Sequence, residues 1–282
     1  MASLKLNVLA VGASRNIGYF SAVRLLDKGA TVTFLLRSPA VFDDDALIQG
    51  YIKSGHVRLV KGDATKEEDT RRAWNEAGVV DALIFSVGKY LRGTPSFSIL
   101  KGIVIDQPNL CAQSILNVLC TMPTYADAPQ PRIIVISSIG LTRTAHDALP
   151  HLIKPMYSML NGPHRDKIGM ERVLAHCAGW TWNSKADGEP GADIVGEGWR
   201  ERPGLPAPGT LKRVLVIRPA LLTDGKCVAD KVAASGKEKK TYRVSEEELG
   251  GYTISRKDTA HFVVDALARW DEFENKRVNV AY

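Results

Sequence analysis

The residues best suited to chemistry stand within the first forty positions. An apolar run over 6–11 leads into a glycine-rich turn and then into a helical pattern. A glycine turn between a buried strand and a helix presents backbone N–H groups and the positive end of the helix dipole to an anion. In a strand–helix–strand unit that anion is usually the pyrophosphate of a dinucleotide. The turn therefore predicts a phosphate-binding site made of Gly12, Ser14, Arg15, Asn16, Ile17 and Gly18.

Arg37 directly follows the second predicted strand. This strand covers 30–36, and Arg37 and Ser38 come next. An acidic residue at this place accepts hydrogen bonds from a ribose diol and repels a 2′-phosphate. An arginine instead attracts a 2′-phosphate and cannot accept hydrogen bonds from the diol. Charge-assisted hydrogen bonds of this kind are worth about 1.5–3 kcal/mol. The sequence therefore predicts NADP(H) as the cofactor.

Short apolar strands that alternate with helical stretches must position these residues. Several strands are nearly continuous in Val, Ile and Leu, as expected in a parallel sheet covered on both faces. The predicted strands are 6–11, 30–36, 57–61, 82–85, 132–136, 214–218 and 277–282, and the predicted helices are 17–28, 66–77, 110–122 and 167–177. The alternation predicts an α/β fold, a Rossmann-type doubly wound parallel sheet with a small C-terminal substrate lobe, in one domain over 1–282.

Two helices are predicted by residue spacing. Four apolar side chains in 167–177 recur at i, i+3, i+4 and i+7, which places one helix face in the core. These are Met170, Val173, Leu174 and Cys177. Lys167 lies one turn before this stripe, near the edge of the buried face. Ser255 and Asp258 have the spacing of a capping box, so we expect another helix to begin at Ser255.

Three further segments are expected to shape a substrate pocket. The interval 183–210 is rich in Gly and Pro and has no usable periodicity. A loop of that length inside a compact domain is usually functional or disordered, so it is either a cap over the pocket or an exposed excursion. We assign the substrate lobe to about 142–165 and 221–254.

Composition and charge exclude several classes of protein. The chain has 282 residues, a formal net charge of +6 and four cysteines without close pairing or metal-ligand spacing. We therefore expect free buried thiols and no metal site. No apolar run approaches the roughly 20 residues that cross a bilayer, and a strand begins too early for a signal peptide. The sequence predicts a cytoplasmic protein with a small-molecule substrate, without nucleic-acid or membrane partners, and leaves the oligomeric state open.

Seven ordered segments resemble an atypical branch of the short-chain dehydrogenases/reductases, the NAD(P)-binding NmrA-like and biliverdin IXβ (flavin) reductase-like group. In the glycine motif, Asn16 stands where the family usually has its middle glycine. The other segments are Gly-Asp-Ala at 62–64, Ser86-Val87-Gly88, Ile136-Ser137-Ser138, Lys167 followed by Glu171, Arg218 to Gly225, and Ile254 to Ala260.

The resemblance implies roles for individual residues. Ser138 takes the position of the catalytic serine, and Lys167 takes that of the lysine, which holds the nicotinamide ribose. Asp63 either meets the adenine ring or caps the following helix. The remaining residues implied in cofactor binding are Ala64, Ser86, Val87, Gly88, Pro219 and Leu221.

The resemblance fails at the family's catalytic tyrosine, whose position is occupied by Pro163. Three possibilities for the proton donor stay open. The first is Tyr157, which we place with the catalytic residues, the second is His164, and the third is water or Ser138. The implied activity is NADPH-dependent reduction of a small carbonyl, quinone or flavin-like acceptor. The alternative is a non-catalytic NADP(H) sensor that acts through a protein partner, which the missing tyrosine favours.

Overall fold

The fold is built around an eight-stranded sheet. The computed structural model describes residues 5–88, 97–98, 102–103, 107–141, 161–235, 241–247 and 249–282. The strand order is β10-β12-β8-β7-β4-β1-β2-β3, and every pairing except β10 with β12 is parallel. Their bounds are β1 (Asn7–Val11), β2 (Thr31–Leu36), β3 (Val57–Lys61), β4 (Ala82–Phe85), β7 (Arg132–Ile136), β8 (Val214–Pro219), β10 (Arg243–Ser245) and β12 (Lys276–Ala281). The predicted strands are confirmed, with ends that shift by at most one residue.

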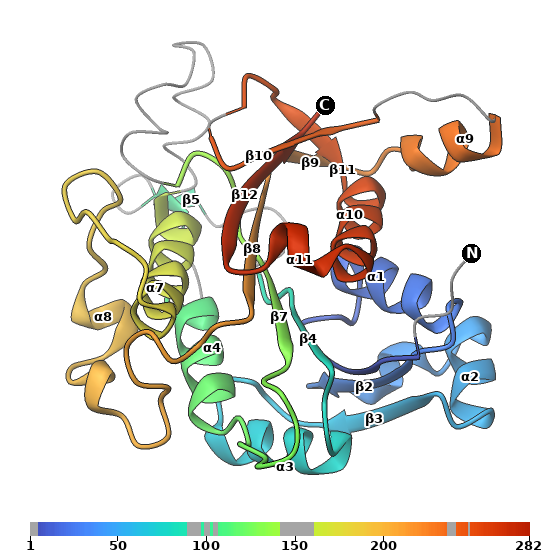
Figure 1. Ribbon diagram of the computed structural model, residues 1–282, viewed down its shortest axis with the longest axis horizontal. Coiled ribbons are helices and arrows are strands. Elements are labelled where there is room, and N and C mark those ends of the chain that lie inside the picture. Colours follow the sequence, from blue (N-terminus) through green and yellow to red (C-terminus); the bar gives the residue numbers. More distant parts are fainter. Residues whose placement is uncertain are drawn as a thin grey trace.

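Helices cover both faces of the sheet. Figure 1 shows α4, α7 and α8 on one side of β7 and β8, and α1 and α10 on the other. One layer contains α1 (Asn16–Leu26), α2 (Ala46–Lys53), α10 (Arg256–Ala268) and α11 (Trp270–Phe273). The other contains α3 (Glu67–Ala77), α4 (Leu110–Cys120), α7 (Asn161–Ala178) and α8 (Ala192–Val195). The doubly wound α/β fold predicted from the sequence is therefore confirmed.

The two layers have separate hydrophobic cores because side chains alternate along each strand. In β1, Val8 and Ala10 pack into the core with α1 and α10, whereas Leu9 and Val11 pack into the core with α3, α4 and α7. All four side chains are at most 1% exposed. Strands with two buried faces explain the near-continuous Val, Ile and Leu runs.

The topology places a ligand-binding crevice beside β1. From β1 the chain moves outward through β2 and β3, and it then returns to the other side of β1 with β4. Open α/β sheets bind ligands outside the carboxyl ends of the strands at such a switch point. The turn after β1 lies at this point.

Helix α7 begins at Asn161, six residues before the predicted start. The predicted apolar stripe is confirmed, because Met170, Val173, Leu174 and Cys177 are fully buried. The start was missed because the first turn carries no apolar repeat. Pro163 falls in that turn, where its missing N–H removes no intrahelical hydrogen bond.

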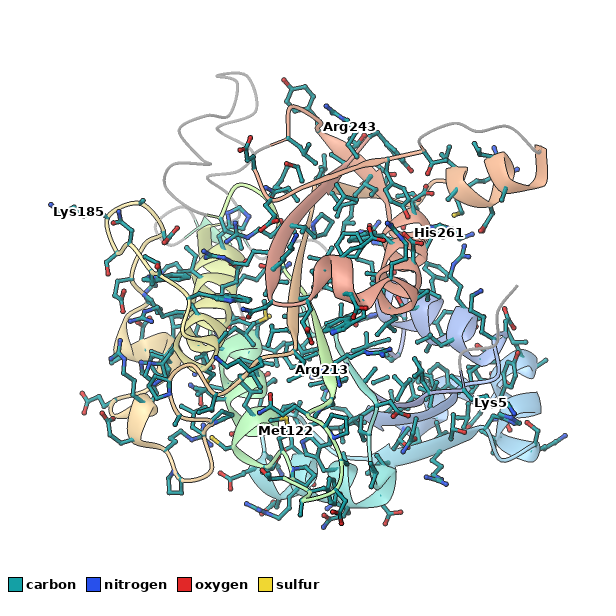
Figure 2. The ribbon with its side chains drawn as sticks, viewed as in Figure 1. Lys5, Met122, Lys185, Arg213, Arg243 and His261 are labelled. Carbon is teal, nitrogen blue, oxygen red and sulfur yellow. The ribbon has the colours of Figure 1, made fainter. Side chains whose placement is uncertain are left out.

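The interval 183–210 packs on the outer side of α4 and α7. It contains α8 and the short 3₁₀ helix η2 (Trp199–Glu201), and Ile194, Val195 and Trp199 are at most 5% exposed. Arg172 of α7 lies over the Trp199 ring at 5.9 Å. Lys185 projects from the outer side of this segment (Figure 2). The segment thus packs as an outer part of this helix layer, because its apolar side chains join a core that periodicity could not reveal.

The C-terminal part carries short elements that the sequence did not show. These are β9 (Leu221–Thr223), α9 (Val228–Ser235) and β11 (Thr253–Ser255), which pairs with β9; elsewhere lie η1 (Pro39–Phe42), β5 (Phe97–Ser98) and β6 (Gly102–Ile103). Helix α10 begins after Ser255 as predicted, and the Ser255 hydroxyl accepts a hydrogen bond from Asp258 N at 2.9 Å. The Asp258 carboxylate accepts from the backbone N–H groups of Val228 and Ala229, which joins α9 to α10.

The four cysteines are free and buried, as expected. Within the described ranges, no helix combines the length and apolar character that a membrane crossing needs. In the same part of the chain, no group of three or more His, Cys, Asp or Glu side chains is placed to hold a metal ion.

Candidate cofactor and active site

A cavity of about 490 Å³ lies at the carboxyl ends of the central strands. This volume is in the range of small-molecule and cofactor sites. Fifteen of the site residues considered in the sequence line it: Gly12, Ser14, Arg15, Asn16, Ile17, Gly18, Arg37, Asp63, Ala64, Ser86, Val87, Gly88, Ser138, His164 and Lys167. The fold thus brings together segments that are far apart in the chain.

The glycine turn is held against the end of β4. A Cβ atom on Gly12 would lie 2.5 Å from Val87 N, and Gly12 has a φ of +78°. A Cβ on Gly18 would lie 2.2 Å from the Ser86 hydroxyl oxygen, and that hydroxyl donates to Gly12 O at 2.9 Å. Only glycine fits both the dihedral and the contact at position 12.

Asn16 adopts the left-handed conformation, with φ of 56°. It is the first residue of α1, and Arg15 before it is extended. Asparagine enters this region more easily than most residues with a Cβ atom. Asn16 can therefore replace the middle glycine of the motif without changing the path of the turn.

Arg15, Arg37 and Ser38 line the end of the cavity beside β2. Asp63 lies at the same end, and its carboxylate accepts hydrogen bonds from the backbone N–H and the hydroxyl of Thr65 at 2.9 and 2.8 Å. Helix α3 begins after Lys66, so the capping role that the sequence left open for Asp63 is not observed.

Two consecutive serines follow β7 and point to different places. Ser138 lines the cavity, whereas Ser137 is 1% exposed and donates a short hydrogen bond to Glu171. Glu171 also forms a bidentate ion pair with Arg218 at the end of β8. Burial disfavours the Glu171 carboxylate, but Arg218 and Ser137 outweigh it and hold the pKa of Glu171 below its ordinary value.

Lys167 lies one turn before Glu171 in α7. Its ammonium group donates to the Ser137 carbonyl oxygen at 2.7 Å. Desolvation lowers the pKa of Lys167, and the neighbouring Cys111, Glu171 and Asp166 only partly oppose this. The lysine is therefore anchored on the strand end that carries Ser138.

Asp166 and His164 lie on the same turn of α7 and also line the cavity. The Asp166 carboxylate accepts hydrogen bonds at 2.9 Å from Cys111 N and Ala112 N, at the N-terminus of α4. A carboxylate at a helix N-terminus is favoured by the helix dipole. This contact fixes the start of α7 to α4.

Some cavity residues were missed, and some expected ones lie elsewhere. Pro219 and Leu221 are not among the lining residues, and Leu221 is 42% exposed, whereas Leu222 lines the cavity. Arg256 also lines it, and its guanidinium donates to Asp224 at 2.7 Å. Arg256 falls in the segment 254–260 of the family resemblance, but no role was predicted for it, because its approach to the cavity depends on how α10 packs. Tyr157 lies outside the described residues, as does 142–160 of the expected substrate lobe.

Solved structures and one curated sequence resemble this chain. A short-chain dehydrogenase from Burkholderia cenocepacia J2315, in complex with NADP, shares 16% identity at a TM-score of 0.51, over 92% of this chain and 89% of that chain. The anaerobillin reductase ChuY from Escherichia coli O157:H7 shares 14% identity at a TM-score of 0.55, over 97% and 96%. In sequence, the reductase pytE of Aspergillus terreus is 27% identical over 299 residues, which cover both chains completely.

No family model matches the sequence. The likenesses nevertheless confirm the resemblance to Rossmann-fold NAD(P)-binding and short-chain dehydrogenase proteins at the level of the fold.

Proposed function

We propose that this chain is an NADPH-dependent reductase that transfers hydride to a small carbonyl, quinone or flavin-like acceptor. The observation that carries the proposal is the cavity, which has a glycine turn and two arginines at one end and Ser138 and Lys167 at the other. The reductase named among the relatives and the NADP-bound neighbour support an NAD(P)-dependent oxidoreductase.

The residues present fit a phosphorylated dinucleotide. Arg15 and Arg37 supply cations for a 2′-phosphate, and the first turn of α1 supplies N–H groups for the pyrophosphate. Arg256 adds a third guanidinium, because α10 packs beside α1 with Lys257 over the Phe20 ring at 5.4 Å. We assign Arg256 to the pyrophosphate as well.

The opposite end of the cavity orients the reacting groups. Bound NADPH supplies the hydride, and the chain supplies position and a place for charge to go. The Lys167 ammonium group has donors beyond its bond to Ser137 O, and we assign them to the ribose hydroxyls on the nicotinamide side. The Ser138 hydroxyl is left to hydrogen-bond the acceptor oxygen.

The test of the cofactor assignment is Arg37→Asp. Removing the cation and adding an anion should lower the NADPH over NADH preference by about tenfold or more, since a charged hydrogen bond is worth about 1.5–3 kcal/mol. This preference is the ratio of the dissociation constants for NADH and NADPH, both measured by calorimetry. Lys5→Asp is the matched control, because Lys5 (labelled in Figure 2) is exposed, precedes β1 at the amino end of the strand and does not line the cavity. An unchanged preference would overturn NADPH as the cofactor.

A second candidate function is a non-catalytic NADP(H) sensor, which Pro163 at the tyrosine position favours. A panel of flavins, quinones, aldehydes and ketones separates the two. Tight NADPH binding without oxidation by any of these acceptors would favour the sensor over the reductase.

A further inference from the structure

The cavity holds a titratable side chain that the assignments above leave unused. His164 is 8% exposed and lines the cavity together with Ser138 and Lys167. His164 and Lys167 are three residues apart in α7, and such residues lie on the same side of a helix. Imidazole is the side chain whose ordinary titration falls near neutral pH, which suits a proton donor.

The turn that carries His164 is fixed from two directions. Asp166 binds the N-terminus of α4 through Cys111 N and Ala112 N, and Lys167 binds the Ser137 carbonyl oxygen after β7. A group placed on elements anchored in this way keeps its position relative to the reacting atoms. His164 is therefore held by the same supports that hold Lys167.

We propose that His164 is the acid that protonates the oxygen of a carbonyl acceptor. The proposal rests on the function proposed above. When hydride adds to the carbonyl carbon, the π-electron pair of the C=O bond moves to the oxygen. This oxygen takes a proton from the imidazolium of His164 and becomes a hydroxyl. The cofactor is left oxidised, and neutral His164 recovers its proton from solvent.

Several charges share the cavity with His164. Arginine and lysine side chains favour neutral imidazole, whereas carboxylates favour imidazolium. These groups are Lys167 and Asp166 from α7, Arg15 after β1, Arg37 after β2, Asp63 after β3 and Arg256 from α10. Only imidazolium carries the proton, so the rate of carbonyl reduction should fall as the pH rises. This decrease with pH should be absent in a variant without His164.

The decisive comparison uses two acceptors with His164→Gln. An aldehyde, 4-nitrobenzaldehyde, forms a strongly basic alkoxide and needs an acid. A quinone, menadione, forms a far less basic phenolate and does not. Loss of a general acid typically costs about 10²–10⁴-fold. We expect kcat for the aldehyde to fall by roughly that factor and to lose its dependence on pH, while kcat for menadione and KM for NADPH stay within about threefold.

Two further variants serve as control and as rescue. His176→Gln removes the other histidine of α7, whose ring packs on Trp199 at 5.1 Å outside the cavity, and it should leave the aldehyde-to-menadione ratio unchanged. In His164→Ala, added imidazole should restore part of the aldehyde reduction. If Tyr157→Phe reproduces the selective loss and His164→Gln does not, the proton comes from Tyr157 and the proposal is wrong.

A readout without turnover completes the test. In NMR titrations of the wild-type chain, the ring protons of His164, assigned by their loss in His164→Gln, should change their titration midpoint when NADP⁺ binds. The midpoint of His176 should stay the same. A His164 midpoint unaffected by NADP⁺, or an unchanged acceptor ratio in His164→Gln, overturns the role of His164. Failure of the wild type to bind NADPH overturns the proposed function instead.

Discussion

The two ends of the cavity are built in different ways. At one end, the glycine turn, Arg37 and Asp63 follow three consecutive parallel strands, and backbone geometry does most of the shaping. At the other end, Ser138 and Lys167 come from segments far apart in the chain, and Lys167 is anchored by its hydrogen bond to the Ser137 carbonyl oxygen. The first end depends on local sequence, whereas the second depends on the whole fold. Variants at each end should therefore fail for different reasons.

The largest expected effect is at the second end, in Glu171→Gln. Glu171 is 2% exposed and is paired with Arg218 and Ser137. Removing one partner of a buried ion pair typically costs about 3–5 kcal/mol, because the other charge stays buried without compensation. The free energy of unfolding from urea denaturation should fall by this amount. Asp193→Asn is the control. It breaks an exposed ion pair with Arg165, which lies on α7 as Glu171 does, and it should lower the free energy of unfolding by less than about 1 kcal/mol.

The same pair predicts a pH dependence. The pKa of Glu171 is lower in the folded chain than its ordinary value of 4.5, so its contribution to stability is present above that value. This contribution is lost as the pH falls through the lowered pKa. The stability difference between wild type and Glu171→Gln should therefore narrow in acid, and a constant difference between pH 7 and pH 3 would contradict the assignment.

The next effect is at the first end, in Gly12→Ala. The new Cβ combines an unfavourable positive φ, about 1–3 kcal/mol by itself, with a clash against the backbone of Val87. We expect NADPH affinity to fall roughly 100-fold in calorimetric titrations. Gly55→Ala is a matched control, since Gly55 has a φ of +77° and open space around it. It should lower stability by the strain alone and leave the NADPH affinity unchanged.

The contrast between the two ends also explains what the sequence could predict. A strand, a glycine turn and Arg37 are contiguous, so their arrangement follows from local geometry. No role for Arg256 could be predicted, because nothing near it in the chain reveals that α10 packs against α1. The contacts of 183–210 were hidden for the same reason, since Trp199 and Ile194 are buried against helices that periodicity alone does not place beside them.

Arg256→Gln tests the arginine that α10 brings to the first end. If Arg256 binds the pyrophosphate, its loss weakens NADPH and NADH equally, by about tenfold, because both nucleotides carry this group. Arg37→Asp should instead weaken NADPH selectively, so the ratio of the two dissociation constants separates the arginines. Lys257→Gln is the neighbouring control, since its ammonium group packs on Phe20. Loss of affinity for NADPH alone in Arg256→Gln would place Arg256 at the 2′-phosphate.

The smallest effect tests whether the first end depends on backbone conformation or on the Asn16 side chain. With φ of 56°, Asn16 occupies a region that costs a residue such as alanine about 1–2 kcal/mol. Asn16→Gly should keep NADPH affinity within about twofold, because glycine adopts this conformation freely. Asn16→Ala should weaken binding roughly fivefold or more when measured by the same calorimetry. If Asn16→Gly is as weak as Asn16→Ala, the amide side chain contacts the cofactor, and the backbone account of this end is wrong.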